Sequence, residues 1–272
     1  MSNLVVRGLS GLVYVLLILG ATFFIPQGSY YLAALFGLLA LIEWQQFKPD
    51  SQYRLYTGLS ISILLISMAI LYPKEQGAIN GVLGFINVLL ILWIAFHSLL
   101  SKPKKENALE SLFRNTFGLV YLILPLLALA AMGDRPWVLA GVFIMIWCFD
   151  SFAYLSGRLL GKHKMSPNIS PNKTWEGFAG GALFASLAGY LLHLYAGEST
   201  MALWHWLILA ILVVFSATLG DLFESALKRN HGKKDSGKLL PGHGGILDRI
   251  DSLLVAMPVA YLFLKLVASN SL

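Results

Sequence analysis

The residues best suited to chemistry in this sequence lie between Ser225 and Asp251. In this stretch six basic side chains stand beside three aspartates, two histidines and several glycines, in a chain that is otherwise mostly apolar. Basic groups, carboxylates, Gly-rich turns and a helix start are the parts that bind phosphates and a divalent metal ion. At a membrane surface, this combination indicates a reaction between a nucleotide and a lipid.

The carboxylates of this region form a candidate metal site. Asp248 and Asp251 are three residues apart at the expected start of the last helix, so they share one helix face. Asp221 ends the preceding apolar segment. Such oxygen ligands suit Mg²⁺, which completes its shell with water and substrate phosphate. The alternative is that carboxylates near a helix N-terminus only stabilise the helix dipole.

Glycines and basic pairs in the same region are candidate phosphate ligands. Gly242-His243-Gly244-Gly245 leads into the last helix, where backbone N–H groups could bind an anion, although an ordinary turn has the same composition. The basic pairs 228–229 and 233–234 could hold the phosphates of a nucleotide and a lipid headgroup. They could equally be solvated clusters beside the membrane.

A second candidate motif covers residues 170–177, which we expect to form a turn running into a helix. Thr174 could cap that helix, and Lys173 could reach a phosphate at its start. An ordinary cap followed by a basic residue at the inner membrane surface explains the same residues.

Some residues inside the apolar segments also carry predictions. Asp150 lies well inside a segment, where an acidic group costs about 2.5–3.5 kcal/mol, so it either faces a polar cavity or hydrogen-bonds a neighbouring helix. Glu43 is nearer a helix end, and we expect it to reach the interface. Small residues at every fourth position predict close helix packing, at Gly177, Gly181, Ala185 and Gly189.

The elements that must position these residues are membrane helices. Hydrophobic residues make up 57% of the 272 residues and charged residues 12%, which predicts an all-α, polytopic membrane protein with a single catalytic domain over 1–272. The net charge of +6 fits loops that meet anionic lipid better than it fits nucleic acid. We expect about nine transmembrane helices, at 9–25, 29–47, 55–72, 79–100, 116–132, 136–156, 174–195, 203–221 and 250–268.

Basic residues predict the orientation. A cytoplasmic N-terminus places 17 of the 20 lysines and arginines inside and the C-terminus outside. The first apolar segment is then a retained span rather than a signal peptide. The larger loops 101–115, 157–173 and 222–249 all become cytoplasmic. We therefore expect an active site facing the cytoplasm, formed mainly by residues 150–177 and 221–251.

The last loop resembles the signature of the phosphatidate cytidylyltransferases, also called CDP-diacylglycerol synthases. That signature runs from Ser-x-apolar-Lys-Arg through Lys-Asp to His-Gly-Gly and Asp-Arg-x-Asp. This chain carries it without a gap, at Ser225, Leu227, Lys228, Arg229, Lys234, Asp235, Gly237, Leu240, Pro241, His243, Gly244, Gly245, Ile246, Asp248, Arg249, Ile250 and Asp251. Residues 170–177 look like the family's second motif, with Asn172 where a lysine is frequent.

The resemblance implies transfer of cytidylate from CTP to phosphatidic acid, which gives CDP-diacylglycerol and pyrophosphate for phospholipid synthesis. It implies catalytic roles for Asp221, Asp248, Asp251 and Lys228, with the three aspartates binding Mg²⁺ and K⁺ as a possible second ion. The expected substrate-binding residues are Ser225, Lys228, Arg229, Lys234, Asp235, His243, Gly244, Gly245, Arg249, Lys173 and Thr174. It further suggests a homodimer in the lipid bilayer of a bacterial inner membrane, with no nucleic acid partner.

Two other readings remain open at this point. A CTP-dependent lipid or polyprenol kinase would use the same nucleotide, metal and membrane but would transfer the γ-phosphoryl group. A membrane transporter would also have many spans and an intramembrane acidic residue such as Asp150. Against a transporter, the polar residues crowd one face and no internal repeat with matching interrupted spans is evident.

Overall fold

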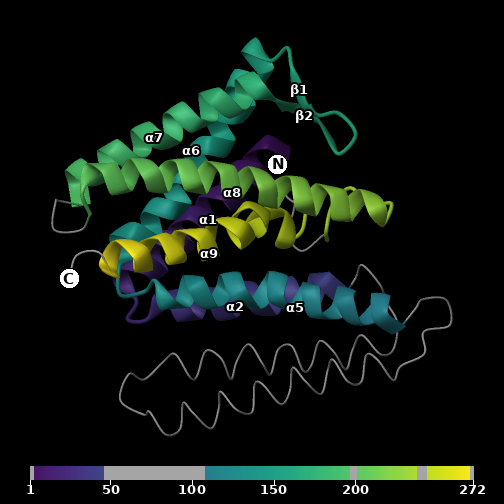
Figure 1. Cartoon of the computed structure of the whole chain (residues 1–272), viewed down its shortest axis with the longest axis horizontal. Helices are drawn as coiled ribbons and strands as arrows, with labels where there is room; N and C mark the ends of the chain where they lie inside the picture. Colours follow the sequence, from purple (N-terminus) through teal and green to yellow (C-terminus); the bar gives the residue numbers. More distant parts are fainter. Residues whose placement is uncertain (1–2, 46–107, 197–200, 238–243, 270–272) are drawn as a thin grey trace, which may run out of the picture.

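The computed structural model describes residues 3–45, 108–196, 201–237 and 244–269 (Figure 1). These residues fold into helices and one short hairpin, and the helices lie side by side in a bundle. The helices are α1 (Asn3–Phe24), α2 (Gly28–Gln45), α5 (Ala108–Ala131), α6 (Pro136–Leu160), α7 (Trp175–Ala196), α8 (Leu203–Asn230) and α9 (Leu247–Ser269). The hairpin pairs β1 (Lys164–Ser166) with β2 (Ser170–Thr174) in antiparallel register.

The helices confirm the predicted class of all-α membrane protein. Four of them are long and apolar enough to cross a bilayer, namely α6, α7, α8 and α9, and α1, α2 and α5 each contain a shorter apolar stretch. The expected spans at 55–72 and 79–100 lie outside the described residues. The count of nine spans and the direction of the termini stay predictions.

Helix α8 is longer than the sequence indicated. The predicted span ended at Asp221, with a loop from residue 222, but the helix continues to Asn230. The extension is favoured by the pairing of Glu224 with Lys228 one turn later, and by Phe223 and Leu227, which continue the apolar pattern. The side chains from 221 to 229 are therefore held by rigid helix and not by a loop.

The hairpin between α6 and α7 was not predicted, because its strands are too short and too polar to show an alternating pattern. It is fixed at its base by the Glu176 carboxylate, which accepts the backbone N–H groups of Lys162 at 3.1 Å and His163 at 3.2 Å. Thr174 caps α7 as expected, since its Oγ1 accepts the N–H of Gly177 at 3.1 Å. The hairpin therefore stands in a defined place at one end of the bundle (Figure 1).

Small residues allow α7 to approach its neighbours closely, as the spacing predicted. A Cβ added at Gly181 would lie 2.7 Å from the Phe149 carbonyl oxygen on α6. One added at Gly189 would lie 3.1 Å from the Trp206 carbonyl oxygen on α8. This packing places the ends of α6, α7 and α8 around one space beside the hairpin.

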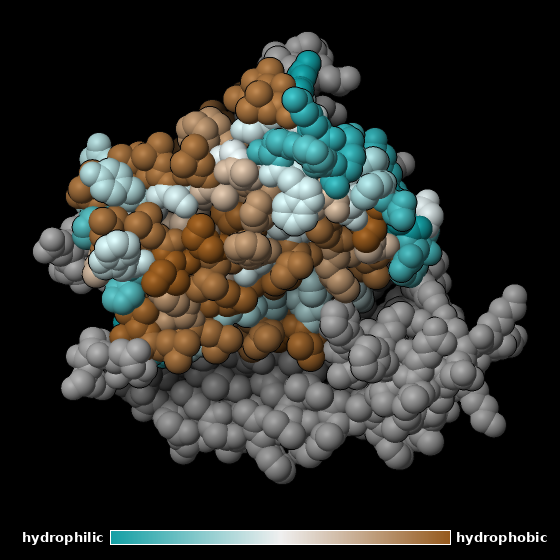
Figure 2. Space-filling model, turned by 45° about the horizontal axis from the view of Figure 1, so that its top comes forward, coloured by the Kyte–Doolittle hydropathy of each residue, from teal (hydrophilic) through white to brown (hydrophobic). Residues whose placement is uncertain are grey.

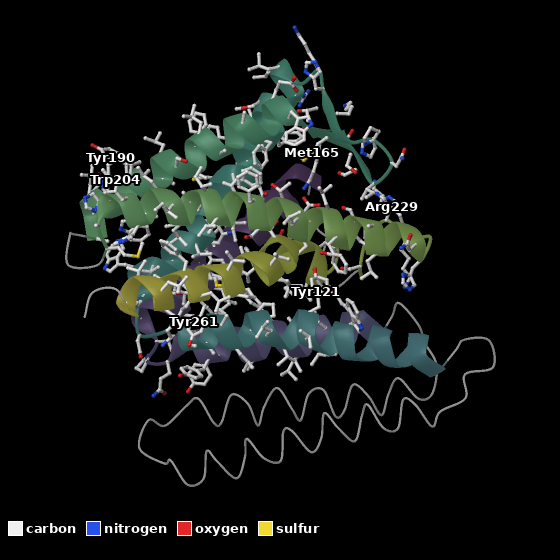
Figure 3. The ribbon with its side chains drawn as sticks, in the orientation of Figure 1. Tyr121, Met165, Tyr190, Trp204, Arg229 and Tyr261 are labelled. Atoms are coloured by element: carbon white, nitrogen blue, oxygen red, sulfur yellow. The ribbon has the colours of Figure 1, made fainter. Side chains whose placement is uncertain are left out.

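The two ends of the bundle differ in chemistry. Figure 2 shows a broad hydrophobic face, with hydrophilic residues gathered on the side where Figure 1 places the hairpin. In Figure 3, Met165 and Arg229 lie toward this end, whereas Tyr190 and Trp204 lie at the opposite end. Aromatic side chains such as these are common at a membrane–water interface. The polar end holds every site residue described next.

Candidate active site

The close contact of α8 with α9 brings the acidic residues of the two helices together. A Cβ at Gly220 would collide with the Asp251 carbonyl oxygen, so the two backbones can approach this closely only with glycine at this position. Asp251 as a result interacts electrostatically with Asp221, Glu224 and Asp150. Four carboxylates from three helices thus share one region, and such a region requires compensating positive charge.

Lys228 supplies part of that charge from inside the protein. Its Nζ lies 2.7 Å from Asp248 Oδ1 and 3.3 Å from Glu224 Oε1, and the residue is only 8% exposed. The other oxygen of Glu224 is buried and accepts no hydrogen bond from the described residues. A buried lysine is stable only when paired in this way, so Lys228 locks α8 against the start of α9.

The second oxygen of Asp248 is also fully engaged. Its Oδ2 accepts the N–H of Ser236 at 2.9 Å, the hydroxyl of Ser236 at 2.9 Å and the N–H of Gly245 at 2.8 Å. Gly244 adopts φ +79°, a backbone conformation that favours glycine, at the turn that delivers these donors. Asp248 therefore organises the loop before α9 by accepting hydrogen bonds from Lys228 and two backbone N–H groups, beside the Ser236 hydroxyl.

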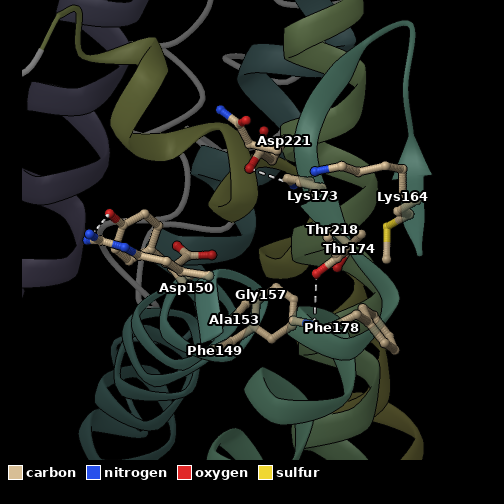
Figure 4. A pocket seen from close by; sticks show the side chains of 15 residues that line it. Phe149, Asp150, Ala153, Gly157, Lys164, Lys173, Thr174, Phe178, Thr218 and Asp221 are labelled. Atoms are coloured by element: carbon tan, nitrogen blue, oxygen red, sulfur yellow. Dashed lines mark hydrogen bonds and ion pairs between the residues drawn. The ribbon is translucent and has the colours of Figure 1, made fainter. Parts of the chain in front are cut away.

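A cavity of about 590 Å³ opens beside this cluster, between α6, α7, α8 and the hairpin (Figure 4). Lys173 reaches across its wall to Asp221, with Nζ 2.6 Å from Oδ2. The lining combines cationic, acidic and apolar groups. It consists of Phe149, Asp150, Ala153, Tyr154, Gly157, Arg158, Lys164, Met165, Asn172, Lys173, Thr174, Gly177, Phe178, Thr218 and Asp221.

The charges around the cavity suit a substrate that carries several phosphates. Arg158, Lys164 and Lys173 contribute three cationic side chains to the lining, from α6, β1 and β2. Asp150 lines the cavity too, which agrees with the prediction of a polar environment for this intramembrane acid. The apolar part of the lining, including Phe178, is suited to the glycerol or acyl region of a lipid.

The predicted site residues separate into three groups. Asp221, Lys173 and Thr174 line the cavity, while Ser225, Lys228, Gly245 and Asp248 belong to the hydrogen-bonded cluster, which meets the cavity where Ser225 donates to Asp221 at 3.3 Å. The remaining predicted residues form the third group, and their relation to the site differs. Gly244 forms the turn beside Asp248, and both Asp251 and the exposed Arg249 interact electrostatically with Asp150 of the cavity lining. Arg229, whose Nη1 donates to the Lys233 carbonyl, is exposed, as are Lys234 and Asp235, and His243 lies outside the described residues.

The acidic residues fit a divalent cation only in part. Within the described ranges, no three His, Cys, Asp or Glu side chains are arranged to hold a metal ion. Asp251 nonetheless interacts electrostatically with Asp221, which lines the cavity, and with the buried Glu224. Mg²⁺ commonly uses one or two carboxylates and takes its other ligands from water and substrate phosphate. The carboxylates of Asp221 and Asp251 suit this kind of coordination. The metal site formed by three aspartates stays a prediction.

Glu43 is a residue beside the cluster whose position the sequence analysis predicted wrongly. It does not reach the interface: it is 1% exposed, and Ile246 N–H donates to its Oε1 at 2.7 Å. Its Oε2 accepts the N–H of Leu247 at 3.0 Å and lies 3.0 Å from the Ser236 hydroxyl, whose one proton is shared between Glu43 and Asp248. The sequence showed an acidic residue next to apolar neighbours, but nothing local indicated partners about 200 positions later in the chain.

Comparison with known proteins defines the class. The model of the cytidylyltransferase family matches residues 5–267 of this chain, which therefore belongs to that family. The chain is 33% identical over 234 residues to a phosphatidate cytidylyltransferase of Staphylococcus haemolyticus, covering 86% of this chain and 87% of the relative.

Two further relatives carry the same name. The protein from Staphylococcus saprophyticus is 35% identical over 240 residues, with 86% of this chain and 87% of the relative covered. The protein from Staphylococcus aureus is 49% identical over a shorter stretch of 122 residues, 45% of this chain and 46% of the relative. The chain is thus a membrane-embedded nucleotidyltransferase, as its signature residues predicted.

Proposed function

We propose that this protein transfers cytidylate from CTP to phosphatidic acid and releases pyrophosphate, which gives CDP-diacylglycerol. The observation that carries the proposal is the cationic and partly apolar cavity at the polar end of a chain of this family. A cavity of this kind suits both a nucleoside triphosphate and a phospholipid headgroup. Relatives that align over most of the chain are phosphatidate cytidylyltransferases, which supports the same reaction.

The reaction joins two anions, so the protein must first reduce their repulsion. A phosphatidate oxygen attacks the α-phosphorus of CTP, and the bond from that phosphorus to the pyrophosphate oxygen breaks. Arg158, Lys164 and Lys173 are placed to neutralise the phosphates and to hold them in line. The attacking phosphate is already an anion near neutral pH, since the second pKa of a phosphate ester is about 6, so no strong base is needed.

The proposed cofactor is Mg²⁺, with K⁺ as a candidate second ion. Asp221 and Asp251 would hold Mg²⁺ at the edge of the cavity, and the ion would supply positive charge to the phosphates. Lys173 forms an ion pair with Asp221, one of the proposed Mg²⁺ ligands. Lys228 forms ion pairs with Asp248 and Glu224 and so holds these two carboxylates in place. A direct metal contact from Asp248 would require it to exchange one of its hydrogen-bond donors.

The polar end is proposed to face the cytoplasm of a bacterial cell, with the bundle spanning the inner membrane. CTP is a cytoplasmic metabolite, and the positive-inside distribution of basic residues gives the same orientation. Nine spans with a cytoplasmic N-terminus and an outer C-terminus complete this arrangement. A homodimer and the absence of a nucleic acid partner belong to the same proposal.

The test uses membranes containing this protein, phosphatidic acid, Mg²⁺ and CTP labelled at either the α- or the γ-phosphate. We expect label in the lipid only from α-labelled CTP, together with released pyrophosphate. Label from γ-labelled CTP alone would instead establish a lipid kinase. Lack of transfer from either, with folded protein, would contradict enzyme activity on this lipid and favour a transporter.

A further inference from the structure

Glu43 occupies a site built for a carboxylate at the junction of three elements. It lies in the last turn of α2, and its partners are Leu247, the first residue of α9, and Ile246, the residue just before it. The first N–H groups of a helix have no partner within the helix and must be satisfied from outside. A distant carboxylate therefore caps α9, in place of a local Ser, Thr or Asp side chain.

The loop backbone is shaped around this carboxylate. A Cβ at Gly237 would lie 2.7 Å from Glu43 Oε1, and a Cβ at Gly245 would collide with Glu43 Oε2 and with the Ser236 hydroxyl. Both glycines let the loop approach the carboxylate more closely than a larger residue would allow. Gly237 and Gly245 of the signature therefore allow the loop backbone to pack against the Glu43 carboxylate, in addition to any contact with substrate.

A hydrogen-bonded path leads from Glu43 to the ion pair of the active site. The Ser236 Oγ lies 3.0 Å from Glu43 Oε2 and 2.9 Å from Asp248 Oδ2, and Asp248 Oδ1 accepts from Lys228. Asp248 Oδ2 also accepts the backbone N–H groups of Ser236 and Gly245. Glu43 holds these same two parts of the loop, through the Ser236 hydroxyl and the N–H of Ile246. Moving the Glu43 carboxylate would therefore move Asp248.

We propose that Glu43 is a positioning residue, which fixes Asp248 and Lys228 for cytidylyl transfer by tying the loop before α9 to α2. The inference rests on the proposed function above. Because Glu43 is buried and is not among the residues that line the cavity, its loss alters geometry more than substrate affinity. Displaced positioning groups lower kcat strongly even when binding is retained.

The kinetic test compares Glu43→Gln, Glu43→Ala and Ser236→Ala with the unaltered protein in the labelled-CTP assay. Glu43→Ala should lower kcat by about a hundredfold, and Glu43→Gln, which keeps one acceptor oxygen, by about tenfold. The KM values for both substrates should stay within about twofold. Ser29→Ala is the matched control, since it removes another buried hydrogen bond of α2, to the Ala130 carbonyl, and should leave both constants unchanged.

A second measurement does not depend on activity. Amide hydrogen exchange should become faster at Ile246 and Leu247 in both Glu43 variants and stay unchanged in Ser29→Ala. Unchanged kcat in Glu43→Gln, or faster exchange spread equally over all helices, would overturn the positioning role. If the unaltered protein itself transfers no cytidylate, the proposed function fails, whereas the exchange result still decides whether Glu43 holds the loop.

Discussion

Lys173 Nζ lies 2.6 Å from Asp221 Oδ2, and this ion pair joins the two motifs that the sequence keeps nearly 50 residues apart. The lysine comes from strand β2 and the aspartate from the C-terminal half of α8, and both side chains line the cavity (Figure 4). Their side chains are 24% and 30% exposed, so the pair remains accessible to a phosphate-bearing substrate. This ion pair ties the hairpin to α8 beside the cavity, and the Lys173 ammonium group is also available to a bound phosphate.

Replacement of Lys173 by Gln should therefore impair catalysis more than folding. We expect kcat/KM to fall by about a hundredfold, the usual loss when one charge-stabilising donor is removed. Lys265→Gln provides a control, because that lysine lies 5.4 Å from the Tyr261 ring centroid near the opposite end of α9. Equal effects of the two substitutions would contradict a specific role for Lys173.

The buried group of Lys228, Asp248 and Glu224 predicts a large effect on stability. Lys228→Met leaves two carboxylates without their cation, which should cost about 3–5 kcal/mol in the free energy of unfolding. The triple variant Lys228→Met, Asp248→Asn, Glu224→Gln removes the charges together and should recover much of that loss. Denaturant titration of the purified protein in detergent measures both values, and a harmless single substitution would disprove the buried pairing.

Gly245 offers a steric test of the loop geometry. Gly245→Ala introduces a methyl group that collides with the Ser236 hydroxyl and the Glu43 carboxylate, so it should destabilise the protein by about 1–3 kcal/mol and reduce activity. Gly11→Ala in α1 meets no atom within 4 Å and should be neutral or slightly stabilising. Thermal unfolding and the transfer assay on the two variants distinguish them. A fully active Gly245→Ala would show that the loop is not packed this closely.

Much of the fold and part of the site were accessible from sequence, for physical reasons. Long apolar segments predict membrane helices because the bilayer leaves few alternatives, and the cap at Thr174 follows from a local rule. For Asp150 the sequence left two alternatives, a polar cavity or a hydrogen bond between helices, and the fold places it in the cavity lining. The hairpin gave no periodic signal. The role of Glu43 could not be predicted, since it depends on tertiary contacts with Ser236 and with the start of α9. Asp248 was correctly placed at the helix start, but its full set of donors required the folded loop.

Metal dependence separates direct ligands from organising residues. Activity should disappear when EDTA removes divalent cations and return when Mg²⁺ is added. If Asp221 and Asp251 hold Mg²⁺, replacing either with Asn should raise the Mg²⁺ concentration for half-maximal activity by about tenfold or more, since each removes a charged oxygen ligand. The exposed Asp134, in the turn before α6, provides Asp134→Asn as a control that should leave the Mg²⁺ requirement unchanged.

Asp248 is the residue for which this titration is most informative. Both of its oxygens already accept hydrogen bonds, so we expect Asp248→Asn to lower the maximal rate while the half-saturating Mg²⁺ concentration changes by less than about twofold. A rise equal to that of Asp221→Asn would mean that Asp248 exchanges a donor for the metal, as the three-aspartate prediction requires. In that case Lys228 would have to release Asp248 Oδ1, or the loop would have to release Oδ2, when the substrates bind.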